Sequence, residues 1–142
     1  MLILGYAGVI PFVVGAVMIW FDGPIDPYFF LQAFHIYSFL VLAFLCGIWW
    51  GIALAKFDPN TRLRLLIGST IILVVSWLVM VFKENNWLIA FLAVAYTLIY
   101  IFEVRCSHLP LESDYLRMRR NLTIIVVLCH FSVFYYLYIF MN

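Results

Sequence analysis

Two histidines, His35 and His130, lie in long apolar stretches and could bind a cofactor together if the fold brought them close. Ser38 follows His35 by one helical turn, and Thr123 precedes His130 by two turns on the same helical face. Paired intramembrane histidines are the ligand set of a bis-histidine haem. Their positions along helices that rise about 1.5 Å per residue put them roughly 10 Å apart in depth, too far for two axial ligands of one iron. We expect both rings to be neutral and to hydrogen-bond across helices. A haem- or quinone-binding redox site at His35 or His130 is the alternative.

Other polar residues give weaker patterns. Ser69 and Ser76 share a helical face and are also expected to bond across helices. Cys106 and His108 are too few and too close in sequence for a zinc site, which takes four ligands. No nucleophile stands beside a matched base. We therefore expect no catalytic residue, no metal and no cofactor, in a protein that is not an enzyme.

The composition is that of a membrane protein. The 142 residues are 68% hydrophobic and 11% charged, with a mean hydropathy of +1.12, whereas soluble domains are about 45–50% apolar and about 25% charged. We expect no Asp, Glu, Lys or Arg side chain inside the apolar cores, and we place Glu103 in a connecting loop. This pattern argues against an ion-coupled transporter or proton pump. The absence of a basic face argues against a nucleic-acid partner.

The pattern predicts an all-α integral membrane bundle of five transmembrane helices in a single domain, residues 1–142. Asp26 before Pro27 and Asp58 before Pro59 are typical helix starts, with a carboxylate cap and proline at the first helical position. Pro11 should kink the first helix and deprive the carbonyl of Ala7 of its usual partner. The expected helices are 2–21, 28–55, 60–82, 87–104 and 113–140.

Basic residues predict the orientation. With five spans, seven of the eight lysines and arginines fall on one side, and Lys83 falls on the other. The positive-inside rule then places the N-terminus in the cytoplasm and the C-terminus outside, in the bacterial inner membrane or, in a eukaryote, the mitochondrial inner membrane. Anionic headgroups are the expected contacts of the arginines on the basic side. These arginines are Arg62, Arg64, Arg117, Arg119 and Arg120.

A strip of small residues marks the second predicted helix. Ala43, Gly47, Gly51 and Ala55 recur every fourth position, the GxxxG spacing that lets helix backbones approach closely in lipid. A second small face, Gly8, Pro11 and Gly15, lies on the first helix. We expect these two faces to meet, with packing inside the bundle as the simplest use of the strip.

Three segments resemble one family of small uncharacterised integral membrane proteins, related to transmembrane protein sixty-nine. Residues 4–12 resemble its LGxAGxxPF opening, residues 44–51 its FLGGIxWG motif, and residues 115–123 its YLRLRxxLT segment. The resemblance implies the order of the helices and a membrane location. It implies no activity.

We therefore expect the protein to function by packing its helices against other membrane proteins rather than by catalysis. We expect an accessory or assembly subunit that docks on a larger inner-membrane complex, or a scaffold that self-associates as a homo-oligomer. The lipid bilayer and other membrane subunits are the expected partners. Lipid binding at the cytoplasmic face is a further alternative beside the redox site.

Overall fold

The computed structural model describes residues 2–21, 26–56, 58–82, 85–106 and 113–140, and every element there is an α-helix. The class and the five helical runs are confirmed, because α1 and α2 together form the first run. Four helices, α3 to α6, are long and apolar enough to cross a membrane, and the first run, Gly5–Trp20, is shorter. The helices are α1 (Leu2–Ala7), α2 (Ile10–Trp20), α3 (Pro27–Lys56), α4 (Pro59–Phe82), α5 (Asn85–Cys106) and α6 (Ser113–Phe140).

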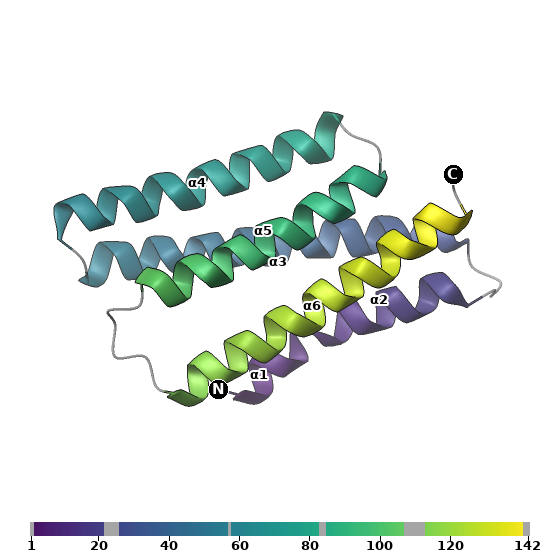
Figure 1. The fold of residues 1–142 in the computed structure, drawn as a ribbon, viewed down its shortest axis with the longest axis horizontal. Coiled ribbons are helices and arrows are strands. Elements are labelled where there is room, and N and C mark those ends of the chain that lie inside the picture. Colours follow the sequence, from purple (N-terminus) through teal and green to yellow (C-terminus); the bar gives the residue numbers. More distant parts are fainter. Residues whose placement is uncertain (1, 22–25, 57, 83–84, 107–112, 141–142) are drawn as a thin grey trace.

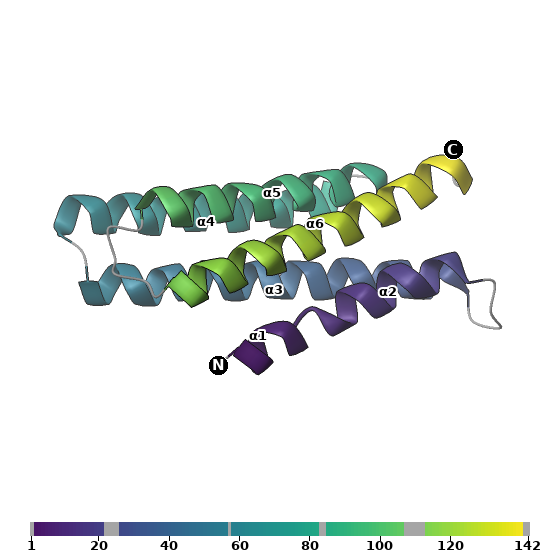
Figure 2. The ribbon, with the colours of Figure 1, turned by 60° about the horizontal axis from the view of Figure 1, so that its bottom comes forward.

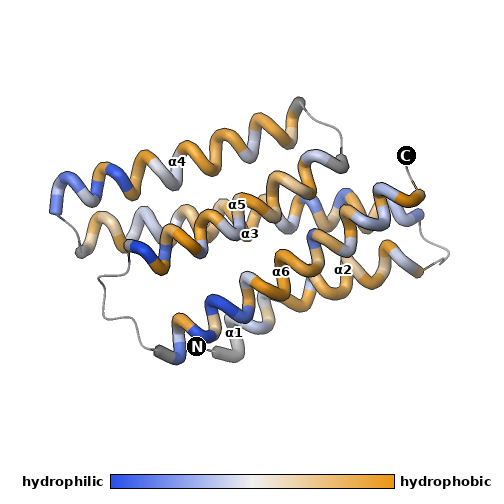
Figure 3. Tube along the Cα trace, in the orientation of Figure 1, coloured by the Kyte–Doolittle hydropathy of each residue, from blue (hydrophilic) through white to orange (hydrophobic). Residues whose placement is uncertain are grey.

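The helices form a bundle in which chain neighbours pack together. α2 packs on α3, α3 on α4, α4 on α5 and α5 on α6, and α6 returns to contact α2 (Figures 1 and 2). The starts of α1, α4 and α6 lie at the same end of the bundle as the end of α5. Hydrophilic segments gather at this end, whereas the middle parts of the helices are mostly apolar (Figure 3). We call it the basic end, because Arg62, Arg64, Arg105, Arg117, Arg119 and Arg120 lie on these segments.

Two helix starts follow the predicted capping pattern. The backbone N–H of Tyr28 donates to Oδ1 of Asp26 at 2.9 Å. The N–H groups of Asn60 and Thr61 both donate to Oδ2 of Asp58 at 3.2 Å. These bonds satisfy donors that the first turn of a helix leaves unpaired.

The first helical run breaks at Gly8 and Val9, between α1 and α2. Pro11 lies in the first turn of α2 and has no N–H to donate to the carbonyl of Ala7. The hydroxyl of Tyr37, on α3, donates to the carbonyl of Gly8 at 2.8 Å. Beyond the break α1 contacts α6 and diverges from α3 (Figure 2). The proline-directed bend therefore opens space between α1 and α3.

The prediction that the two small faces meet is wrong. Gly47 and Gly51 lie on the exposed side of α3, and a Cβ atom built on either glycine has no described atom within 4 Å. α2 instead packs on the opposite side of α3, where a Cβ built on Gly15 comes 3.1 Å from Cδ2 of Phe34. Phe34 is 2% exposed, so this side of α3 forms the core.

Candidate functional site

A cavity of about 420 Å³ occupies the space that the bend opens. Its walls come from α1, α2, α3 and α6, with Tyr96 of α5 at the back, and we call it the α1–α3–α6 cavity. The exposed side chains of Leu40 and Phe44 form part of its rim, so it opens toward lipid. Most of the wall is apolar, and representative residues are Val9, Phe12, Leu40, Phe44, Ile48 and Leu122.

A buried ion pair lies at the basic end of this cavity. Nη2 of Arg119, on α6, lies 2.7 Å from Oε2 of Glu103, on α5, and Nε donates to the same oxygen at 2.9 Å. The hydroxyl of Tyr115 donates to Oε1 of Glu103 at 3.0 Å. The side chains of Arg119 and Glu103 are only 12% and 6% exposed. Arg119 and Tyr115 line the cavity, and Arg119 is the one charged residue among the described lining residues.

This pair corrects two expectations from the sequence. Glu103 lies inside the span Trp87–Arg105 rather than in a loop, so a carboxylate does lie within an apolar span. Arg119 is paired with it, and the expected contact of Arg119 with lipid headgroups stays a prediction. Val127 is the middle of the span Asp114–Phe140, and the eight residues from Arg119 to it correspond to about 12 Å. The pair therefore lies just inside the edge of a hydrocarbon core that is about 30 Å thick.

His130 is the centre of a second polar group, deep in the bundle. Its Nε2 lies 2.8 Å from Oγ of Ser38, and its Nδ1 lies 2.8 Å from the carbonyl oxygen of Val126. Because a carbonyl can only accept, a neutral ring donates from Nδ1 and accepts the Ser38 hydroxyl at Nε2. The hydroxyl of Tyr96 donates to the Ser38 carbonyl at 2.7 Å. The expected cross-helix bond of His130 is thus confirmed.

The same geometry bears on catalysis and on haem binding. Ser38 and His130 are both 0% exposed, so the serine oxygen cannot reach a substrate as a nucleophile must. Ligation of iron by Nε2 requires loss of the bond to Ser38. Ser38 lies only three residues from His35, so His130 is about one helical turn from His35 in depth, closer than the roughly 10 Å expected.

Among the described residues, the serines of α4 bond within their own helix rather than across helices as predicted. Oγ of Ser69 donates to the carbonyl of Leu65 at 2.9 Å, and Oγ of Ser76 donates to the carbonyl of Ile72 at 2.6 Å. Both partners lie one turn earlier in the same helix. This local bonding satisfies a buried hydroxyl without another helix.

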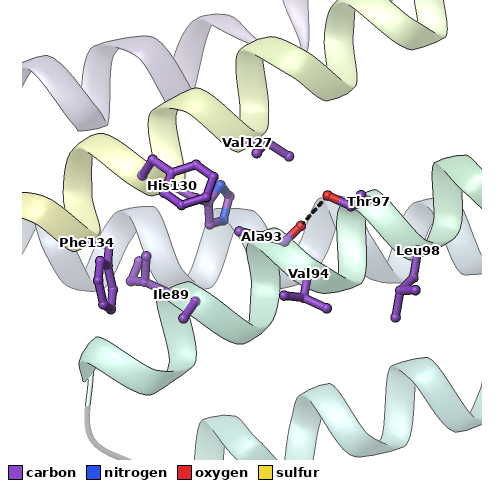
Figure 4. A pocket seen from close by; sticks show the side chains of 10 residues that line it. Ile89, Ala93, Val94, Thr97, Leu98, Val127, His130 and Phe134 are labelled. Carbon is purple, nitrogen blue, oxygen red and sulfur yellow. Dashed lines mark hydrogen bonds between the residues drawn. The ribbon is translucent and has the colours of Figure 1, made fainter.

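A smaller cavity of about 280 Å³ lies between α5 and α6 (Figure 4). His130 reaches its wall, but both ring nitrogens already have partners. The hydroxyl of Thr97 donates back to the carbonyl of Ala93 at 2.9 Å. This cavity therefore offers an apolar surface and little polar recognition, in contrast to the α1–α3–α6 cavity.

The predicted site residues are distributed over several surfaces. Arg64, Arg117 and Arg120 are exposed, and Arg62 is half-buried; their contact with headgroups stays a prediction. Gly8 lines the α1–α3–α6 cavity, whereas Gly47 and Gly51 face outward. Cys106 and His108 lie outside the residues whose side chains are described. Sequence reasoning missed Tyr37, Tyr96, Glu103 and Tyr115. One available pattern was the i, i+4 spacing of Tyr115 and Arg119, which places both on one helical face.

The fold and composition define a multi-pass membrane protein built as an α-helical bundle. Residues 1–135 match the family described as "Protein of unknown function (DUF3429)", so the chain belongs to this family. The match establishes no relationship to transmembrane protein sixty-nine, and that part of the resemblance stays a prediction. No curated protein and no solved structure matches the chain.

Proposed function

We propose that the protein binds a membrane amphiphile in the α1–α3–α6 cavity without transforming it chemically. The observation that carries this proposal is a lipid-facing apolar cavity of about 420 Å³ with Arg119 and Tyr115 at one end. Ligand sites are typically concave and mostly apolar, with a few polar groups that fix orientation. The acyl or prenyl chain lies along α3 and α6, and the polar head lies at the basic end.

The position of the ion pair supports this orientation of the ligand. An amphiphile in a bilayer places its head near the edge of the hydrocarbon core, and Arg119 lies close to that depth. By the positive-inside rule this end faces the cytoplasm, with the N-terminus inside and the C-terminus outside. We therefore propose lipid binding from the cytoplasmic leaflet, in the bacterial inner membrane or its mitochondrial counterpart.

Filling the cavity tests the proposal. Val41 lines the cavity and is half-buried, so Val41→Trp should block it. Val74, on α4, is 47% exposed, so Val74→Trp is the matched control at a lipid-facing position. The full chain is purified from its native membrane in mild detergent, and bound amphiphiles are identified by extraction and mass spectrometry.

We expect an amphiphile to co-purify stoichiometrically with the wild type and with Val74→Trp, and to be depleted several-fold in Val41→Trp. Equal amounts in both folded variants would place the amphiphile on the outer surface of the bundle and contradict the proposal. The expectation of an accessory or assembly subunit, or a homo-oligomeric scaffold, remains a separate prediction. It depends on the outward strip at Gly47 and Gly51.

A further inference from the structure

Hydrogen-bond donors of Arg119 remain available at the basic end of the α1–α3–α6 cavity. A guanidinium carries five N–H groups. Nε and Nη2 are engaged with Oε2 of Glu103, and these contacts use two of the five N–H groups. Because Arg119 lines the cavity, its remaining donors can meet an acceptor on a ligand. Glu103 and Tyr115 hold the guanidinium in position for that contact.

The charge of Arg119 is already compensated. Glu103 and Arg119 together carry no net charge, and both side chains are nearly buried. An anionic head would add a third charge beside Arg119 and Glu103, and it would lose its hydration on entry. Attraction to Arg119 is then opposed by repulsion from Glu103, so the desolvation cost is poorly offset. An uncharged acceptor takes the same N–H bonds without adding a charge.

Among the described residues, the other charged side chains at the basic end do not line the cavity. Arg105, Arg117 and Arg120 are exposed, as is Asp114, and none of them lines the cavity. Charges in water and headgroups are screened over about 10 Å and contribute little to paired interactions. They draw anionic lipids to the surface of the bundle. Selection of the head inside the cavity falls to the Glu103–Arg119 pair.

We infer that the ligand is an amphiphile with an uncharged, hydrogen-bond-accepting head, of the kind found in acylglycerols and quinones. This inference rests on the proposed function, since it names the class of amphiphile that binds at that site. A carbonyl oxygen of the ligand accepts from Arg119, and the chain follows the apolar wall toward Phe12 and Val126. Replacing Glu103 by a neutral residue leaves the arginine uncompensated and should shift the preference toward anions.

The test uses probes that differ in the head. 1-Oleoylglycerol and 1-oleoyl-lysophosphatidate share one acylglycerol body, and the second adds a phosphate; decylubiquinone supplies a quinone carbonyl. Binding to the full chain in maltoside micelles is measured by native mass spectrometry. Comparison of 1-oleoylglycerol with decylubiquinone shows whether the uncharged ligand is an acylglycerol or a quinone. We expect the wild type to prefer at least one neutral probe over lysophosphatidate by about tenfold, corresponding to about 1.4 kcal/mol.

Glu103→Gln should raise the relative affinity for lysophosphatidate by at least about tenfold, a difference of about 1.4 kcal/mol. Arg117→Gln removes an exposed charge and should leave the preference unchanged. Equal or tighter binding of lysophosphatidate by the wild type overturns this inference and leaves the proposed function intact. If none of the three probes binds, the proposed function itself fails. Should Glu103→Gln not fold, the wild-type ratio still decides the question.

Discussion

The hydroxyl of Tyr37, on α3, donates to the carbonyl oxygen of Gly8 at 2.8 Å, where the chain passes from α1 to α2. This bond ties the bend that Pro11 imposes to the neighbouring helix. It also fixes one edge of the α1–α3–α6 cavity, because both residues line it. The direction of α1, and hence the cavity, depends on a contact between segments 29 residues apart.

Tyr37→Phe should lower the free energy of unfolding by about 1 kcal/mol, the typical contribution of one hydrogen bond. Because α1 loses an anchor, bound amphiphile should also decrease. Unfolding in mixed detergent micelles measures the first effect, and mass spectrometry measures the second. Tyr28→Phe, at a residue that is 52% exposed, is the control. Equal stability of the two variants would show that the bond to Gly8 contributes nothing.

Replacing one member of the buried Glu103–Arg119 pair should lower the free energy of unfolding more than replacing both members. Glu103→Met or Arg119→Met alone leaves an uncompensated buried charge, and we expect a loss of about 3–5 kcal/mol. The double variant should recover most of that loss, since buried pairs are often replaceable by apolar residues. Arg117→Met, at an exposed arginine, should change stability by about 1 kcal/mol or less. Additive losses in the double variant would contradict a coupled pair.

Substitution by leucine should lower the stability of the bundle at Gly15 but not at Gly47. Gly15→Leu forces a side chain against Phe34, where even a Cβ lies 3.1 Å from Cδ2, and should cost about 1–3 kcal/mol. Gly47→Leu extends into open space and should leave the stability of the isolated bundle unchanged. Thermal unfolding of both variants in one detergent measures the difference.

The exposed small-residue strip at Gly47 and Gly51 leads to a separate prediction about association with other proteins. Gly47→Leu with Gly51→Leu should release protein partners in a mild-detergent pull-down, because close approach of helix backbones needs small residues. A double variant that folds and keeps every partner would show that the strip faces only lipid.

Ser38→Ala removes the hydroxyl that donates to Nε2 of His130 and leaves a buried acceptor unsatisfied. The expected loss is about 1–3 kcal/mol. Ser69→Ala is the matched control, because Ser69 is also buried but bonds only to carbonyls of its own helix. Similar losses in the two variants would mean that His130 does not depend on Ser38.

The free energy of unfolding should decrease at acidic pH, because protonation of Asp58 weakens the N-terminal cap of α4. Hydrogen bonds from the side chain and backbone of Thr61 hold the pKa of Asp58 below its ordinary value. A depressed carboxyl pKa gives stability that is present above the unfolded-state pKa of about 3.9 and is lost as the pH falls through the folded-state value. Asp58→Asn keeps a capping oxygen without this titration. Its midpoint of thermal unfolding should depend less on pH below about 4 than that of the wild type.

Local features of the sequence predicted much of the secondary structure. The Asp-Pro pairs at residues 26–27 and 58–59 start α3 and α4 because a carboxylate and a proline both suit the first helical turn. The bend near Pro11 follows from a missing backbone donor. The gathering of arginines at one end follows from the number and order of the apolar runs.

The rotation of each helix about its axis could not be predicted in the same way. Most positions along α3 are apolar, and lipid accepts an apolar face as readily as a protein core does, so hydrophobicity does not identify the buried side. Gly47 and Gly51 were expected inward and lie outward, whereas Gly15 packs against Phe34.

Long-range pairing also decided the polar contacts. Glu103 appears at the end of an apolar run, where the sequence alone is compatible with a solvated loop. Only the packing of α5 against α6 brings it to Arg119, sixteen residues away, and buries both. Sequence by itself thus determined where helices begin, bend and carry charge, because these depend on neighbouring residues. The tertiary structure decided which faces meet and where the cavity and its charged end lie, because in lipid those depend on side-chain fit between helices.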